Sequence, residues 1–336
     1  MIVSLAVVAY NEENTLTSLL NDICRQDYPL DKIDLLLIDS CSKDNTANIM
    51  LEFMNKASEF YSCRFFINKK KQIPCGHNIA IDNFLGDSLI RIDAHASIPC
   101  DFISKNVKVL SSGELASGGR RPNISDRNDS FGKTLLSAEN SVFGSGFAPY
   151  RTGSRKQYSA SLFCGMYKRE VFTKVGKYIE LLPRSEDNEM CHRMRKAGFR
   201  LCYSPEIVFY QYMRPDLSSM LSQKFQNGYW IGKTVGISPG CFSAFHFVPF
   251  LFVISLIFTS FLLYLGFWKF SFLLWAIYLV AVLGVTVLEI IKKPVSTHIF
   301  LPVIFFLVHL SYGLGTLFGL VIMPFWLIRL RRNKYD

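Results

Sequence analysis

The sequence lacks the glycine-rich motifs by which many α/β proteins bind phosphate groups. Neither G-x-G-x-x-G nor G-x-x-x-x-G-K-[ST] occurs in its 336 residues, which excludes the dinucleotide and P-loop sites built on those motifs. The sequence also lacks a C-x-x-C pair, and its nine cysteines are an odd number. We therefore expect no disulfide framework and no cysteine zinc site, and reduced cytosolic thiols fit better.

Charge is also distributed in a way that excludes one class of partner. The net charge is +10, but no run of lysine and arginine with interleaved aromatic residues accompanies it. We expect no nucleic acid partner, and a basic surface beside anionic membrane lipid explains the charge. A signal peptide is not expected either, because Met1 leads directly into a short strand-like run.

Long apolar segments are confined to the C-terminal third. Three of them are long enough to cross a membrane, namely 242–267, 270–291 and 299–328. Only the second contains a formal charge, at Glu289. The composition therefore predicts a cytosolic domain at 1–215, an interfacial segment at 216–241, a membrane region at 242–328 and a basic cytoplasmic tail at 329–336.

Basic residues near the apolar segments predict their orientation. Lys292 and Lys293 follow the second segment, a cluster beginning at Arg329 follows the third, and only Lys269 separates the first two. Both strongly basic flanks and the large N-terminal domain should be cytoplasmic, at the inner (cell) membrane. Three simple crossings cannot satisfy this pattern. Either the glycine-interrupted third segment is a re-entrant hairpin, or one flank violates the rule.

Strand and helix patterns alternate along the N-terminal part of the chain. Continuous apolar strands are expected at 2–10, 33–40, 63–68 and 88–93, and helices with apolar residues at helical spacing at 11–26, 44–57 and 75–86. This alternation is typical of βαβ crossovers. The expected fold class is α/β, with a doubly wound, mostly parallel sheet.

Polar residues stand at the ends of the expected strands, where such sheets bind ligands. Asp93 and His95 follow the fourth strand two positions apart, so on an extended backbone they would point to the same face. They could converge on one divalent cation, which would hold a diphosphate without a glycine-rich loop. The alternative is that Asp93 only opens a turn and His95 is a half-exposed polar residue.

Several motifs occur in an order that resembles a known family. They include VVAYNEE, DSCSKDNT, IRIDAHA and RSEDNEMCHRMRKAGFR, and they extend over roughly residues 1–236. Together they resemble the family 2 glycosyltransferases of GT-A fold, in particular the membrane-anchored branch of the succinoglycan glucosyltransferases. The D-A-H-A sequence is typical of that branch, in place of the commoner D-x-D. The resemblance implies a GT-A type sheet followed by C-terminal transmembrane helices.

The resemblance also implies where a nucleotide sugar would bind. Ala9, Tyr10 and Glu12 lie where the family contacts the nucleotide base and ribose, and Asp39 lies where it binds uracil or ribose. Asp93 matches the residue that contacts the donor diphosphate and the metal.

Two further positions carry the implied chemistry. His95 takes the second position of D-x-D, so Asp93 and His95 are the candidate ligands of Mn²⁺ or Mg²⁺. Asp187 matches the catalytic base. Taken without the resemblance, Asp187 could equally be an acidic residue favoured in the first turn of a helix.

The implied activity is that of an inverting, metal-dependent hexosyltransferase in surface or exopolysaccharide biosynthesis. The expected partners are a UDP-sugar donor, a lipid-linked saccharide acceptor and membrane lipid. Gln223 stands where processive synthases begin Q-x-x-R-W, but Arg-Trp is missing, which favours addition of a single sugar. Two alternatives remain open: a polyprenyl-phosphate hexosyltransferase, and a catalytically inactive nucleotide-sugar-binding membrane scaffold.

Overall fold

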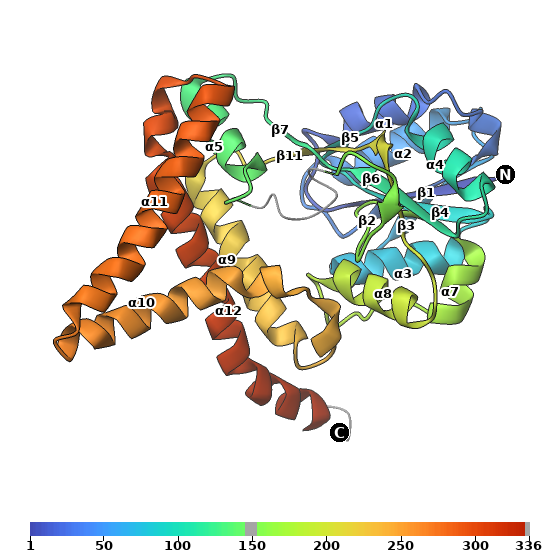
Figure 1. The fold of residues 1–336 in the computed structure, drawn as a ribbon. Helices are drawn as coiled ribbons and strands as arrows, with labels where there is room; N and C mark the ends of the chain where they lie inside the picture. The colour runs from blue at the N-terminus through green and yellow to red at the C-terminus, as the bar shows by residue number, and fades with distance from the viewer. Residues whose placement is uncertain (145–152, 333–336) are drawn as a thin grey trace. The chain divides into compact units, whose positions relative to one another are not determined.

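The computed structural model of the protein describes residues 1–144 and 153–332 (Figure 1). The described residues form two compact units, each with its own core. The first unit consists of 1–122 and 153–212, and the second of 123–144 and 213–332. The stretch 123–144 therefore belongs with the C-terminal helices, a grouping that nothing in its composition indicated.

The first unit alternates strands and helices as the sequence predicts. Its elements are β1 (Val3–Ala9), α1 (Leu16–Cys24), β2 (Ile33–Asp39), α2 (Thr46–Lys56), β3 (Ser62–Ile67), α3 (Ile73–Asn83), β4 (Ser88–Asp93), β5 (Ala96–Ser97), α4 (Phe102–Ser111), β6 (Ala116–Arg120), β8 (Gln157–Tyr158), β9 (Met166–Lys168), α7 (Arg169–Val175), α8 (Glu186–Lys196), β10 (Cys202–Val208) and β11 (Tyr210–Tyr212). All four expected strands are present, within two residues of their predicted ends.

Among the described residues, eight strands form one sheet in the order β3-β2-β1-β4-β9-β6-β10-β8. The pairs from β3 to β4 are parallel, and antiparallel pairs flank β9. The expected doubly wound, mostly parallel sheet is therefore confirmed. The chain adds β2 and β3 on one side of β1 and then places β4 on the other, so the topological switch point lies between β1 and β4.

Each face of the sheet is covered by helices, because the strands are apolar throughout and successive side chains point to opposite faces. On one face Leu5 and Leu35 pack with α1 and α4. On the other face Ala6 and Leu36 pack with α3, α7 and α8 (Figure 1). Along β4 the side chains of Ile90 and Ile92 belong to the first core, so those of Leu89, Arg91 and Asp93 are directed to the α3 and α8 side.

The second unit is almost entirely helical. It contains β7 (Asn123–Ile124), α5 (Ser130–Asn140), α9 (Leu217–Thr234), α10 (Val248–Tyr264), α11 (Trp268–Lys292) and α12 (Leu301–Arg332). Short 3₁₀ turns precede α10 and α12, so the helices suited by length and composition to cross a membrane are 244–264, 268–292 and 296–331. The three apolar segments of the sequence thus correspond to three helices.

The last of these segments does not double back. Residues 301–332 form one continuous helix despite Gly313, Gly315, Gly319 and Pro324. The re-entrant hairpin considered from the sequence is therefore wrong. A glycine lowers the stability of a helix but does not interrupt it where other contacts stabilise the helix. The glycines of α12 are covered by neighbouring helices, and the absence of a side chain permits close packing there.

Candidate active site

The predicted polar residues meet at the switch point of the sheet. In the strand register Ala9 of β1 lies level with Asp39 of β2, and its neighbour Val8 lies level with Asp93 of β4. The three strands therefore end together, and the polar positions that follow them share one edge. This edge is where an open parallel sheet offers a crevice to a ligand.

Strained backbone is concentrated around the same edge. Five non-glycine residues among those described have a positive φ: Asn11, Cys41, Lys71, Cys164 and Ser185. The first three follow β1, β2 and β3, and Ser185 immediately precedes the acidic start of α8. Such conformations are costly for residues with a Cβ and cluster at functional sites. Their position supports the carboxyl edge of the sheet as the working face of this unit.

Glu12 and His95 are joined across this edge. The His95 Nδ1 lies 3.0 Å from one Glu12 carboxylate oxygen, and the other oxygen accepts a 2.7 Å hydrogen bond from the Thr15 hydroxyl. Nε2 of the same ring lies 3.4 Å from the side-chain nitrogen of Gln211. A carboxylate on Nδ1 fixes the tautomer in which Nε2 is the acceptor nitrogen, as in many metal-binding histidines. Glu12 thus orients His95, a relation that the sequence motifs did not suggest.

Asp93 is half-buried, and its carboxylate forms no hydrogen bond or ion pair with any residue that the structure describes. A half-buried carboxylate normally forms a hydrogen bond or an ion pair. Within the described residues no cluster of three or more potential metal ligands exists. One or two protein ligands suffice for Mg²⁺ when substrate phosphates supply others. Asp93, with His95 nearby in sequence, therefore fits a cation that is completed by a diphosphate.

A buried arginine, which the sequence analysis did not identify, links β4 to the start of α8. The Arg91 side chain is 8% exposed, and one of its terminal nitrogens forms an ion pair with Asp187. Its other terminal nitrogen lies 3.5 Å from a Glu186 carboxylate oxygen. The guanidinium is also within 6 Å of the ring centres of Phe163 and Tyr178. Arg91 therefore holds both carboxylates at the end of the strand that carries Asp93.

The two carboxylates differ in environment. Glu186 is buried, whereas the Asp187 side chain is 18% exposed and is the one available to a substrate. Burial raises the pKa of Asp187, and this effect is opposed by Arg91 and reinforced by Asp93. Burial and the neighbouring Asp187 raise the pKa of Glu186 from 4.5 to about 8. Near neutral pH one proton is therefore shared within this group, and Asp187 is the stronger candidate for the ionised member.

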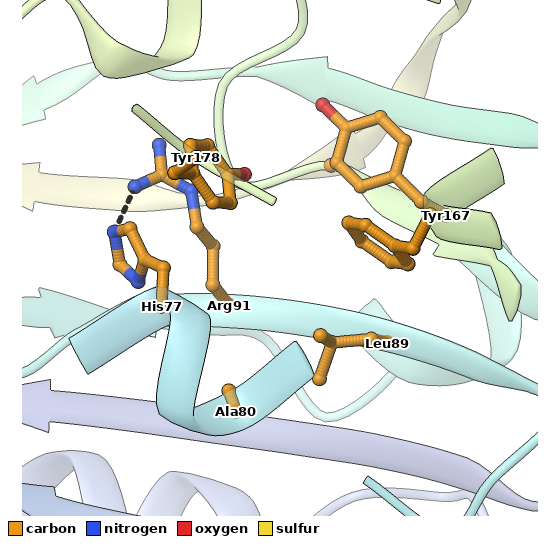
Figure 2. Close-up of a pocket in the computed structure, with 8 residues that line it drawn as sticks. His77, Ala80, Leu89, Arg91, Tyr167 and Tyr178 are labelled. Atoms are coloured by element: carbon orange, nitrogen blue, oxygen red, sulfur yellow. Dashed lines mark hydrogen bonds between the residues drawn. The ribbon is translucent and has the colours of Figure 1, made fainter. Parts of the chain in front are cut away.

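The side of Arg91 away from the carboxylates is closed. Figure 2 shows His77 hydrogen-bonded to the guanidinium, with Tyr178 beside it. Burial and Arg91 lower the pKa of His77 well below 6.5, so the ring is neutral and accepts this hydrogen bond at Nε2. The cavity lined by His77, Arg91, Tyr167 and Tyr178 is too small for a nucleotide sugar. It is a packing space behind the site.

The remaining predicted donor residues lie at the same edge. Tyr10 is exposed, while Ala9 is buried at the end of β1. The Asp39 carboxylate accepts the backbone N–H of Ser42, at 3.1 Å for the shorter of the two contacts, and so closes the turn after β2. An exposed ring beside a fixed turn can stack on and border a nucleotide base. Their roles in donor binding stay predictions.

The raised pKa of Glu186 makes stability depend on pH. The folded chain keeps a proton that the unfolded chain releases above pH 4.5, so the free energy of unfolding should fall as pH rises from 4.5 towards 8. Glu186→Gln, which is neutral throughout, should reduce this slope and be the more stable protein at pH 8. Denaturation of both proteins in detergent at pH 5.5 and pH 8.5 measures the effect. Equal slopes would contradict the assignment of that proton to Glu186.

The sheet, its switch point and the acidic residues there define a GT-A type fold, which solved structures confirm. A mannosyltransferase of Pyrobaculum calidifontis, in complex with GDP-Man and Mn²⁺, superposes with a TM-score of 0.63 over 93% of this chain and 86% of that one. Its sequence identity is 15%, so the likeness concerns the fold.

The family follows from the sequence comparison. The family model Glycosyl transferase family 2 matches residues 4–176, just over half of the chain. The protein therefore belongs to glycosyl transferase family 2, as its motifs predicted, and it is a glycosyltransferase with three apolar C-terminal helices.

Two relatives extend the similarity beyond the family domain. A dolichyl N-acetyl-α-D-glucosaminyl phosphate 3-β-D-2,3-diacetamido-2,3-dideoxy-β-D-glucuronosyltransferase of Methanococcus voltae is 26% identical over 330 residues, 95% of this chain and 97% of that protein. Succinoglycan biosynthesis protein ExoA of Rhizobium meliloti is 29% identical over 200 residues, 58% of each chain. The first relative covers the apolar helices as well as the sheet.

Proposed function

We propose that the protein is an inverting, metal-dependent glycosyltransferase that adds one hexosyl unit from a UDP-sugar to a lipid-linked saccharide at the cytoplasmic face of the cell membrane, during assembly of a surface polysaccharide or exopolysaccharide. The observation that carries the proposal is the pairing of two carboxylates at one sheet edge. Asp93 has no protein partner among the described residues, and Asp187 is close enough for Asp93 to raise its pKa.

The two carboxylates suit the two charges that change during sugar transfer. A divalent cation at Asp93 would stabilise the negative charge of the departing diphosphate. Asp93 would hold that cation, with His95 as the second candidate ligand, oriented by Glu12 at 3.0 Å. Mn²⁺ and Mg²⁺ both accept this combination of oxygen and nitrogen donors, and imidazole favours Mn²⁺.

Asp187 would act on the acceptor. Its carboxylate takes the proton from the acceptor hydroxyl, whose oxygen forms a bond to the anomeric carbon of the donor sugar. The bond from that carbon to the diphosphate oxygen breaks, and its electron pair leaves with the nucleoside diphosphate. Because one base acts on the face opposite the leaving group, the anomeric configuration inverts, and an α-linked donor gives a β-linked product.

Arg91 would keep the base ready for this step. The guanidinium favours the ionised form of Asp187, against the effect of burial. It also fixes the direction of the carboxylate, since His77 and Tyr178 leave the arginine little freedom. Arg91 therefore positions the carboxylate of Asp187. Without Arg91, burial would keep Asp187 protonated over a wider pH range.

The relatives favour a saccharide acceptor over bare polyprenyl phosphate. The Methanococcus protein is named for transfer to dolichyl N-acetylglucosaminyl phosphate, a lipid-linked sugar, with a β-linked product. Because the similarity covers nearly all of both chains, the same class of acceptor is the better hypothesis here. Its donor sugar is a uronic acid derivative, so the identity of the hexosyl unit in this protein is the least constrained part of the proposal.

The acceptor class is tested by the product. Membranes that contain the protein are incubated with radiolabelled UDP-sugars and native lipid extract, and the labelled lipid is subjected to linkage analysis. We expect the label on a saccharide hydroxyl, one sugar further than the acceptor. A label attached directly to the lipid phosphate would instead identify a polyprenyl-phosphate hexosyltransferase. Transfer by membranes with Asp187→Asn to the same extent as by wild-type membranes would exclude the proposed site.

A further inference from the structure

A buried lysine without an anionic partner lies at the end of α9. Lys233 is 6% exposed, and among the described residues its ammonium takes part in no hydrogen bond or ion pair. Burial lowers the pKa of this ammonium, and no carboxylate of the described residues opposes that effect. Buried charges are normally paired with a charge of the opposite sign. The position is therefore suited to an anion from outside the described chain.

Three aromatic rings surround the ammonium. The Lys233 Nζ lies 4.1 Å from the ring centre of Trp326 and 4.2 Å from that of Trp230. The ring centre of Tyr229 is 5.2 Å away. Ring faces stabilise a positive charge, but they leave the three N–H donors of an ammonium without an oxygen acceptor. These four residues, which we call the lysine cage, therefore hold a cation that is still able to bind an oxyanion.

Close packing of α9 on α12 fixes the lysine cage. Three of its residues belong to the last two turns of α9, and Trp326 belongs to α12. A Cβ at Gly232 would lie 2.6 Å from backbone atoms of α12, and one at Gly236 would lie 2.6 Å from the Met323 sulfur. Glycine permits this approach of the two helices. The ammonium is therefore held by an interface between two helices, unlike that of a surface lysine.

The residues around the lysine cage are those of a membrane interface. On α12 the exposed Phe325 and Ile328 precede and follow Trp326, and the exposed Arg329 and Arg331 come next. A change from apolar and aromatic to basic residues along a helix marks the boundary between hydrocarbon and headgroups. Arg329 follows Trp326 by three positions, so the two are neighbours on the surface of the helix. The anion best suited to this place is one attached to a lipid.

We propose that the lysine cage binds the phosphate group of an anionic membrane lipid, with the Lys233 ammonium as the donor and Arg329 as a second cationic contact. An ammonium binds phosphate as a point charge, and basic pockets between helices at the membrane surface bind anionic headgroups. The phosphate belongs either to a phospholipid headgroup or to a lipid-linked substrate, and the chemistry is the same for both. Only the second source rests on the proposed function.

Thermal unfolding of the unmodified protein in dodecyl maltoside tests the class of ligand. Phosphatidylglycerol, farnesyl phosphate, zwitterionic phosphatidylcholine or inorganic phosphate is added at increasing concentration, and a ligand of the folded chain raises the melting temperature. We expect phosphatidylglycerol to act at about fivefold lower concentration than phosphatidylcholine, the change that one basic residue provides near an anionic headgroup. An effect of farnesyl phosphate alone would identify a lipid-linked substrate as the source. Equal effects of all four, or no effect, would overturn the proposal.

Lys233→Met tests the site, since it removes the charge and keeps an unbranched side chain between the rings. We expect the variant to lose the preference for the anionic lipid. Lys269→Met is the matched control and should keep it, because Lys269 is exposed and its Nζ lies 5.7 Å from the ring centre of Trp268. A lower melting temperature in Lys233→Met with an unchanged preference would show that the lysine only joins the two helices. An equal loss in Lys269→Met would assign the effect to general charge, and either result overturns the proposal.

Tryptophan emission locates the lipid without depending on the folding of Lys233→Met. Of the four tryptophans, Trp230 and Trp326 belong to the lysine cage, whereas Trp268 and Trp275 of α11 are exposed and are replaced by phenylalanine. In this variant, which keeps Lys233, the emission should change on addition of the stabilising lipid and stay constant with phosphatidylcholine. Stabilisation by the lipid without a change in emission would show that it binds elsewhere, and would contradict the proposal.

Discussion

Asp187→Asn should reduce sugar transfer by at least about 10²-fold, because the amide cannot accept the proton of the acceptor hydroxyl. The substitution is nearly isosteric and leaves Asp93 and the end of β4 unchanged, so binding of UDP should stay close to that of the wild type. Turnover with saturating donor and acceptor, together with titration of UDP, measures the two quantities separately. A large loss of turnover without loss of UDP affinity is the expected result.

The neighbouring Glu186 provides a matched control. Glu186→Gln removes the other carboxylate that contacts Arg91, on the same turn of α8, but the residue is buried and is not available to an acceptor. This variant should retain most of the turnover. Wild-type turnover in Asp187→Asn would end the assignment of the base, and an equal loss in both variants would point to the charge around Arg91 instead.

Asp93→Ala should abolish activity with either metal, since it removes the half-buried carboxylate that has no protein partner among the described residues and that we propose holds the cation against the diphosphate. Binding of a UDP-sugar in the presence of Mn²⁺, measured by calorimetry, should be lost along with turnover. Binding of uridine alone should persist, because we assign that binding to the edge formed by Tyr10 and Asp39. Metal-dependent binding that is unchanged in Asp93→Ala would show that the strand end is only a turn.

His95 is expected to respond differently to the two metals. If the ring ligates the cation through Nε2, His95→Ala should lose more activity with Mn²⁺ than with Mg²⁺, and His95→Asp should shift the preference towards Mg²⁺. Glu12→Gln should move activity in the same direction as His95→Ala but less far, because it weakens only the group that orients the ring. An equal loss with both metals would indicate a hydrogen bond from His95 to the donor.

The sheet could be predicted because its signals are local. The strands at 33–40 and 88–93 are continuous apolar runs between helical patterns, and they became β2 (Ile33–Asp39) and β4 (Ser88–Asp93). The edge at which the candidate site residues lie could be predicted from the same alternation, since successive parallel strands end on one side of the sheet. The position of the site therefore required no knowledge of distant contacts.

Arg91 was missed although the sequence contained a signal for it. An arginine between Ile90 and Ile92, in a strand buried on both faces, needs anionic partners. The acidic start of α8 follows about 95 residues later, and no local pattern states that the two meet. The contact of Glu12 with His95 was hidden for the same reason, because it joins loops 83 residues apart.

The membrane region shows a different limit. Composition alone identified three apolar segments, and it also showed that their basic flanks conflict with three crossings. It could not show that 301–332 stays helical through its glycines, because these are covered by helices that are distant in the sequence, Gly313 by α10 and Gly315 and Gly319 by α9.

The measurement that tests the account most directly is metal-dependent transfer by the unmodified protein. Membranes with the wild-type chain are incubated with labelled UDP-sugars and lipid extract, in EDTA, Mg²⁺ or Mn²⁺, beside membranes with Asp93→Ala or Asp187→Asn. The account predicts one labelled lipid product with inverted configuration and equimolar UDP, formed only with metal and only by the wild type. Transfer of equal extent in EDTA, or by either variant, would contradict it.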